Sequence, residues 1–160
     1  MKLYLVRHGD AVPMLDDEKR PLSAAGRNEA ENVGWFLKRM VVKPRFIFHS
    51  TLMRANETAQ LIASVLNCAD VLQERQGLRP NDETDNWISE LESEPDHGII
   101  VSHLPFLPAL ASNLITGAED GLSFKFPTGS VLCLEREGYG GWALRHFATS
   151  KLITAGKFQT

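Results

Sequence analysis

The stretch that decides the fold is MKLYLVRHGD, residues 1–10. Four apolar residues, 3–6, run directly into Arg7, His8 and Gly9. A short apolar run bounded by charge predicts a buried central strand rather than a helix. Open α/β sheets bind ligands at the edge formed by the carboxyl ends of their strands. We therefore expect Arg7 and His8 to lie in a binding site, with Gly9 letting the backbone approach whatever His8 holds.

Strands and helices alternate through most of the remaining chain. Apolar strands are predicted over residues 45–50 and 98–102, and helices after Ser23, over residues 52–66 and after Pro105. This alternation predicts a largely parallel sheet with helices on both faces. A hairpin formed by two further apolar runs, 130–135 and 142–147, is expected to place one antiparallel strand at an edge of the sheet.

The composition describes one ordinary domain. The chain has 160 residues, of which 43% are hydrophobic and 23% charged, and no linker or repeat divides residues 1–160. Its net charge of −3 gives no reason to expect nucleic acid or an acidic membrane as a partner. The two cysteines read as buried free thiols, and no signal peptide or membrane span is visible, so we expect a cytoplasmic location.

Polar side chains of the same character follow three of the predicted strands. The pairs are Arg7 and His8, His49 and Ser50, and Ser102 and His103. Arg54 lies one helical turn beyond the second pair. If the three strands are parallel neighbours, these ends share one edge of the sheet, and two histidines and two arginines meet there.

This set of side chains suits a phosphate group. A guanidinium fork binds a tetrahedral oxyanion bidentately, whereas the same arginines would repel a divalent cation, so we predict neither a metal nor a cofactor. His8, kept neutral by nearby positive charge, could attack phosphorus and form a covalent phosphohistidine. His103, Arg7 and Arg54 would stabilise the charge on the transferring oxygens.

Simpler interpretations exist for each residue alone. A histidine after a buried strand is more often structural, and His49, His97 and His146 are interpreted in that way. Arg54 by itself would be a solvated helix residue paired with Glu57. The repetition of one pattern at three strand ends is what favours a phosphate site.

Four stretches together resemble the histidine phosphatase superfamily, the phosphoglycerate mutase-like or RHG group. They are LVRHGDA at residues 5–11 with its strand, PLSAAGRNEA at 21–30, STLMRANETA at 50–59 and IIVSHLP at 99–105, in the order of the family. The arginine before Pro21 and the His-Leu-Pro after the third strand look most like SixA-type phosphohistidine phosphatases. Thr51 stands where the second motif usually has proline.

The resemblance implies a three-layer α/β/α fold and a ping-pong reaction through phospho-His8. By motif match, Arg7, Arg54 and His103 form the phosphate pocket with His8. Arg20 stands where SixA-like members have an arginine, and the resemblance implies that it reaches the phosphate from its loop. Larger members supply a carboxylate general acid after the second helix, and here Asp82 and Glu83 are the candidates, each of which could equally be a solvated or helix-capping carboxylate.

No carboxylate in the sequence is clearly a general acid, and this affects which substrate we predict. A phosphomonoester leaves as an alkoxide and needs protonation, whereas a phosphohistidine leaves as an imidazole. We therefore predict a phosphatase acting on a phosphohistidine protein such as a histidine phosphotransfer domain, with inorganic phosphate as product. The alternatives are a small-molecule phosphomonoesterase of the same fold and a non-catalytic phosphoprotein-binding module.

Overall fold

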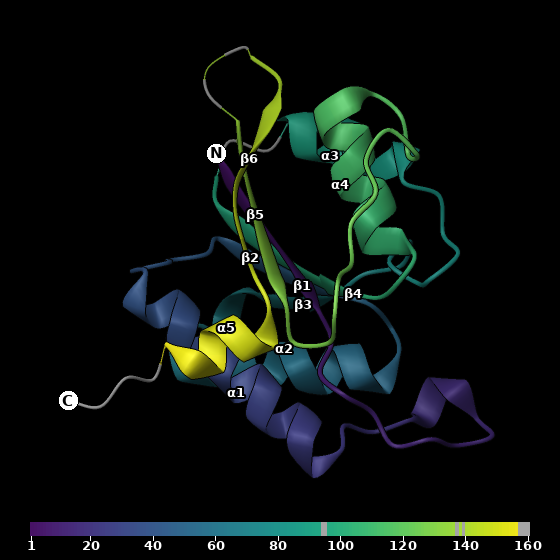
Figure 1. Cartoon of the computed structure of the whole chain (residues 1–160), viewed down its shortest axis with the longest axis vertical. Coiled ribbons are helices and arrows are strands. Elements are labelled where there is room, and N and C mark those ends of the chain that lie inside the picture. Colours follow the sequence, from purple (N-terminus) through teal and green to yellow (C-terminus); the bar gives the residue numbers. More distant parts are fainter. Residues whose placement is uncertain (94–95, 137, 139, 157–160) are drawn as a thin grey trace.

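The computed structural model describes residues 1–93, 96–136, 138 and 140–156, and they contain a six-stranded sheet (Figure 1). Its strand order is β3-β2-β4-β1-β5-β6. The strands are β1 Lys2–Arg7, β2 Phe46–His49, β3 Leu72–Glu74, β4 Gly98–Ser102, β5 Val131–Arg136 and β6 Trp142–Ala148. The opening stretch of the sequence is thus an inner strand, with β4 on one side and β5 on the other.

Parallel pairing brings the ends of three strands together. Strand β4 runs parallel to both β1 and β2, with Arg7 opposite Ser102 and His49 opposite Val101. The His8 amide donates to the Ser102 carbonyl at 3.1 Å, which continues the β1–β4 ladder by one residue. The residues that follow β1, β2 and β4 therefore lie at one edge of the sheet, as the sequence predicts.

Helices cover both faces of the sheet (Figure 1). Helices α1, α2 and α5 pack on one face against Tyr4 and Val6, whereas α3 and α4 pack on the other against Leu3 and Leu5. The alternation of side chains along β1 thus supplies both cores. The bounds are α1 Ala24–Arg39, α2 Met53–Leu66, α3 Asp85–Ser93, α4 Phe106–Thr116 and α5 Ser150–Ala155. None of the helices in the described part of the chain is both long and apolar enough to span a membrane.

The predicted α/β/α architecture is confirmed, and the structure shows which strand of the hairpin lies at the edge of the sheet. The hairpin does lie at one edge, but the strand that opposes the others is β5, one place inside it. The outer strand β6 is antiparallel to β5 and therefore runs in the direction of β1. Helix α5 was not expected from the sequence. It is only six residues long, and Ile153 alone among them is buried, so its apolar pattern is too short to recognise.

Two glycines hold the first loop against α1. A Cβ atom on Gly9 would lie 2.3 Å from the carbonyl oxygen of Gly26, and one on Gly26 would lie 1.9 Å from that of Asp10. Ser23 caps α1 as expected, since its side chain accepts a hydrogen bond from the Gly26 amide. The close approach that Gly9 permits is therefore to the start of α1, and it sets the position of His8 relative to that helix.

Candidate active site

His8 is held in one tautomer by its own backbone. Its Nδ1 atom lies 2.7 Å from the carbonyl oxygen of Gly9. A carbonyl oxygen only accepts hydrogen bonds, so Nδ1 carries the proton in the neutral ring. The lone pair is then on Nε2, the ring nitrogen on the far side from this bond. Neutral His8 is therefore set up to act as a nucleophile or base through Nε2.

His103 faces His8 across the site. The two ring centroids are 5.0 Å apart, and the His103 side chain is fully buried. Neither of its ring nitrogens has a hydrogen-bond partner among the described residues. Burial, helped by the charges of His8 and Arg54, lowers the pKa of His103 to about 2. A buried imidazole with both nitrogens unpaired is costly unless a ligand pairs with it, because buried polar groups are normally hydrogen-bonded.

Arg7 and Arg54 each keep part of their guanidinium unpaired. The Nε atoms of both are buried and have no hydrogen-bond partner among the described residues. Their outer nitrogens are anchored, since Arg7 Nη1 donates to the Phe126 carbonyl at 2.8 Å and Arg54 Nη1 to the Asp17 carbonyl at 2.9 Å. Each side chain is thus fixed in place with a free donor. These donors, together with the ring of His103, could hold an oxyanion beside His8.

The surroundings of His8 keep its ring neutral. Burial is the main cause that lowers the pKa of His8 to about 4. The bond to Gly9 opposes this shift, and the charges of Arg54, Arg7 and Arg20 add to it. Since an unpaired cation is disfavoured beside three guanidinium groups, His8 is neutral at physiological pH.

Asp17 joins two of the arginines. Its carboxylate accepts a hydrogen bond from Arg54 Nη2 at 3.2 Å and another from Arg20 Nη1 at 3.1 Å. Although burial acts in the opposite direction, Arg20 and Arg54 lower the pKa of Asp17. Arg54 is therefore paired with Asp17 and not with Glu57, whose carboxylate instead contacts Arg27 at 3.5 Å.

Arg20 lies near the cluster around His8, but most of its N–H donors already have hydrogen-bond partners. Its Nε donates to the Val12 carbonyl at 3.2 Å, and Nη2 lies 3.5 Å from the Ala11 carbonyl. These bonds hold the loop 10–21 in shape. Its charge nevertheless reaches His8 and contributes to lowering the pKa of that ring. Contact between Arg20 and a phosphate remains a prediction.

The carboxylate of Asp82 is used in a hydrogen bond within its own turn. The Oδ2 atom of Asp82 accepts a hydrogen bond from the Arg79 amide at 2.7 Å, in the segment before α3. Arg79 in turn donates from Nε to Thr51 at 2.8 Å and from Nη1 to Glu18 at 2.7 Å. The structure thus gives Asp82 a local capping partner, and its role as a general acid stays a prediction. Glu83 is exposed and also stays a candidate only.

Three supporting residues are not evident in the sequence. Thr58 accepts from the Gly9 amide at 3.1 Å and donates to the Arg54 carbonyl at 2.7 Å, so it links the loop after β1 to helix α2. Asp17 pairs with Arg54, and the charge of Arg79 helps to lower the pKa of His103. Asp17 lies in the run DDEKR, in which nothing distinguishes it from its acidic neighbours. Arg79 lies outside the recognised motifs.

His49 ends β2 and makes the same kind of local hydrogen bond as His8. Its Nδ1 lies 3.0 Å from the carbonyl of Ser50, and it is buried. This bond does not distinguish His49 from His8, so the structural interpretation of His49 stays a prediction. His97 also has a hydrogen-bond partner within the fold, because its Nδ1 accepts from the Lys2 amide at 2.8 Å.

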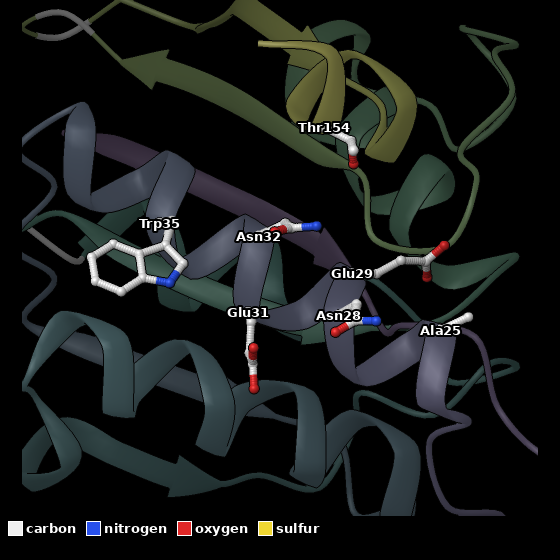
Figure 2. Close-up of a pocket in the computed structure, with 7 residues that line it drawn as sticks. All are labelled: Ala25, Asn28, Glu29, Glu31, Asn32, Trp35 and Thr154. Carbon is white, nitrogen blue, oxygen red and sulfur yellow. The ribbon is translucent and has the colours of Figure 1, made fainter. Parts of the chain in front are cut away.

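A second hollow lies away from this cluster, between α1 and α5 (Figure 2). It has a volume of about 560 Å³ and is lined by Ala25, Asn28, Glu29, Glu31, Asn32, Trp35 and Thr154. Its lining includes two carboxylates and neither an arginine nor a lysine, so a phosphate would be repelled there. Glu29 connects it to the first loop, since its carboxylate accepts from the Asp10 amide at 2.9 Å. The cluster around His8 therefore stays the candidate anion site.

The fold and the cluster together define a class of protein. Two neutral histidines, the half-buried Arg7 and the buried Arg54 of α2 gather at one edge of an α/β/α sheet, and this cluster is a candidate oxyanion site with a potential nitrogen nucleophile. The family model of the histidine phosphatase superfamily, branch 1, matches residues 3–82 of the chain. The chain belongs to this superfamily.

Known proteins support this assignment. The phosphohistidine phosphatase SixA of Escherichia coli strain K12 is 26% identical over 122 residues, which cover 73% of this chain and 76% of SixA. The structure of the protein histidine phosphatase SixA complexed with tungstate superposes with a TM-score of 0.86, at 22% identity, over 94% of this chain and 98% of that one. An α-ribazole-5′-P phosphatase structure from Escherichia coli has a TM-score of 0.76, at 21% identity, over 94% and 98%. The family and these relatives support phosphatase activity.

The depressed pKa of His8 gives a first testable prediction. The Cε1 proton of His8 should titrate in NMR spectra with a midpoint near pH 4, not near the ordinary 6.5. Because the unfolded chain binds this proton at higher pH than the folded one, His8 should lower stability as the pH drops from about 6.5 to about 4, by up to about 1.4 kcal/mol per pH unit, and His103, whose pKa is lowered further, should add a similar slope. Urea unfolding at several pH values measures this slope.

The His8→Asn variant assigns the resonance and serves as the control for stability. Its unfolding free energy should depend less steeply on pH in that window than the wild type. A midpoint at pH 6 or above in the wild type would show that the ring is not held neutral by its surroundings.

Proposed function

We propose that this chain is a phosphohistidine phosphatase in which His8 is the nucleophile. The observation that carries the proposal is that buried nitrogens of Arg7, Arg54 and His103, which surround a neutral His8, have no hydrogen-bond partner in the described part of the chain. A phosphoryl group would supply acceptor oxygens to these nitrogens while placing phosphorus before Nε2. The tungstate bound by the SixA of the same fold is a tetrahedral oxyanion and supports this arrangement.

The proposed reaction has two steps. The Nε2 lone pair of His8 forms a bond to phosphorus while the phosphorus–nitrogen bond of the substrate breaks, and the released imidazole takes a proton from solvent. Water then attacks phospho-His8, its oxygen bonds to phosphorus, the bond to Nε2 breaks, and the lost proton passes to solvent. Arg7, Arg54 and His103 stabilise the charge on the phosphoryl oxygens in both steps.

The choice of substrate rests on the leaving group. An alkoxide must be protonated as it leaves, and a positioned acid contributes about 10²- to 10⁴-fold to such a step. The candidate acid, Asp82, spends one carboxylate oxygen on the Arg79 amide. An imidazole leaves readily without such an acid. This favours a phosphohistidine protein, such as a histidine phosphotransfer domain, over a sugar phosphate.

Two further proposals concern the domain organisation and the cellular location of the protein. We propose that residues 1–160 form one histidine phosphatase domain, since both helix layers pack on the same sheet. We also propose a cytoplasmic location. The thiols of Cys68 and Cys133 are free, Cys133 being buried, and this suits a reducing compartment.

A comparison of substrates tests the function. The wild type is incubated with a histidine phosphotransfer domain phosphorylated on histidine, with p-nitrophenyl phosphate and with several sugar phosphates, and kcat/KM is measured for each. We expect the phosphohistidine protein to be turned over about 100-fold more efficiently than any ester. Comparable or better turnover of a sugar phosphate would instead establish the phosphomonoesterase. Binding without turnover of any substrate would establish the phosphoprotein-binding module.

Asp17 supplies a further prediction about the same site. In the free protein its carboxylate occupies Arg54 Nη2, so it competes with a phosphate for that arginine. Asp17→Asn should therefore bind inorganic phosphate about 3- to 5-fold more tightly, as measured by calorimetry or by product inhibition. Asp16→Asn is the matched control, because Asp16 pairs with Lys19 at 3.1 Å instead. Weaker phosphate binding by Asp17→Asn would mean that the carboxylate orients Arg54 and does not compete for it.

A further inference from the structure

An apolar hollow adjoins Arg7 on the side of α4. Its volume is about 460 Å³, and two segments form most of its wall. The first segment follows His103, and the second precedes β5. The lining residues are Arg7, Leu104, Pro105, Pro108, Phe124, Lys125, Phe126 and Pro127. Apart from Arg7 and Lys125, the hollow therefore presents hydrocarbon and aromatic side chains.

The hollow is joined rigidly to the proposed phosphate site. Arg7 lines the hollow and also donates from Nη1 to the carbonyl of Phe126, at 2.8 Å. Leu104 directly follows His103 in the chain. Any group in the hollow thus lies beside a group bound by Arg7.

A second apolar hollow continues from the first. It has a volume of about 200 Å³ and shares Phe124 with its neighbour. Phe124 stands between the two hollows and packs against Phe126 and Phe147, with ring centroids 6.0 Å away from each. The second hollow reaches Leu144 on β6, and Leu144 is 55% exposed. We call the surface formed by both hollows the apolar strip.

Charge on the apolar strip is confined to the hollow that adjoins Arg7. Lys125 is exposed and has neither an ion pair nor a hydrogen bond among the described residues. It lies next to Phe124, the residue that separates the two hollows. A cation at this place complements an acidic side chain or the phosphoryl group of a bound partner.

We propose that the apolar strip docks an amphipathic helix of the protein that carries the phosphohistidine. This inference rests on the proposed function and adds how the partner is recognised. Arg7, Phe124 and Leu144 follow one another along the surface. A complementary partner therefore presents a phosphoryl group followed by apolar side chains along one of its sides. A helix offers such a row at intervals of three and four residues. A sugar phosphate would leave its hydroxyl groups against hydrocarbon without hydrogen bonds.

The test compares a protein substrate with a small one. The substrates are a histidine phosphotransfer domain phosphorylated on histidine and free phosphoimidazole, which has the same phosphorus–nitrogen bond and no surface to dock. Phe124→Ala should raise KM for the protein about 10-fold or more, and Lys125→Glu about 5-fold, because central contacts of this kind carry most of the binding energy. Both variants should hydrolyse phosphoimidazole as the wild type does.

Matched controls separate docking from folding and from net charge. Phe36→Ala removes a half-buried phenylalanine from the opposite layer, and Lys151→Glu reverses an exposed charge on α5. Both controls should keep the wild-type KM for both substrates. Melting temperatures identify any variant that fails to fold, and Lys125→Glu, an exposed substitution, then carries the test alone.

Each other outcome overturns the inference in a recognisable way. If the variants match their controls, or if they impair phosphoimidazole as much as the protein, docking on the apolar strip is wrong while the proposed function stands. If Phe124→Ala or Lys125→Glu converts a dimer into a monomer in gel filtration, the strip is a contact between copies of this chain. If the wild type hydrolyses neither substrate, the proposed function fails and the docking inference fails with it.

Discussion

Replacing His8 by alanine should reduce turnover of every phosphorylated substrate by about 10⁵-fold or more, since the proposed first step needs its Nε2 lone pair. Among the residues that the structure describes, the ring makes one hydrogen bond, to the Gly9 carbonyl, so its loss should leave the sheet and both helix layers folded. Turnover is measured with a phosphohistidine protein. Acid-labile phosphoenzyme is trapped by rapid denaturation in alkali, and it should be present in the wild type and absent from the variant.

His49→Ala is the matched control for His8→Ala. His8 follows a parallel strand and His49 ends one, both are buried, and both place Nδ1 near the carbonyl of the next residue. We expect His49→Ala to retain turnover and to form the phosphoenzyme. Equal losses in the two variants would show that the effect comes from strand-end packing, and the nucleophile would have to be sought elsewhere.

Arg54→Ala should lower kcat/KM by about 10³-fold, because it removes a buried guanidinium aimed at the transferring phosphoryl group. Arg54→Lys should recover only a small part of this loss, since an ammonium group cannot reproduce the planar fork. Initial rates with phosphoimidazole measure the effect on the chemical step without any contribution from protein docking.

Arg45→Ala controls for the loss of a positive charge. Arg45 is exposed and pairs with Asp96 at the opposite end of β2, at 3.6 Å. Its removal should change kcat/KM by less than about 2-fold, as is typical of exposed ion pairs. Near-wild-type activity of Arg54→Ala would mean that Arg54 serves only to hold Asp17 and the loop 10–21.

The convergence of the strand ends was predictable because it follows from parallel pairing alone. Apolar runs before His8, His49 and His103 are buried strands, and parallel strands place their carboxyl ends at one edge. The confirmed register, with Arg7 opposite Ser102, brings His8 and His103 side by side without any further specification. The family motifs point to the same residues.

The partners of the arginines were not predictable in the same way. The simpler interpretation of Arg54 pairs it with Glu57, three residues along its own helix, yet it contacts Asp17, which is 37 residues away. Local spacing identifies neighbours on a helix, whereas an ion pair between a loop and a helix depends on the path of that loop. The same reason explains Arg79, which reaches both Thr51 and Glu18.

The α/β/α fold, the strands that bear the site and the phosphate-binding candidates follow from the residues alone, because hydrophobic period and strand order act over short stretches. The tautomer of His8, the pairing of Arg54 with Asp17, the place of β5 inside the edge and the apolar strip beside Arg7 emerge only in the folded chain. These features arise where segments far apart in the chain pack together. Their geometry depends on burial and on contacts that no single stretch of residues specifies.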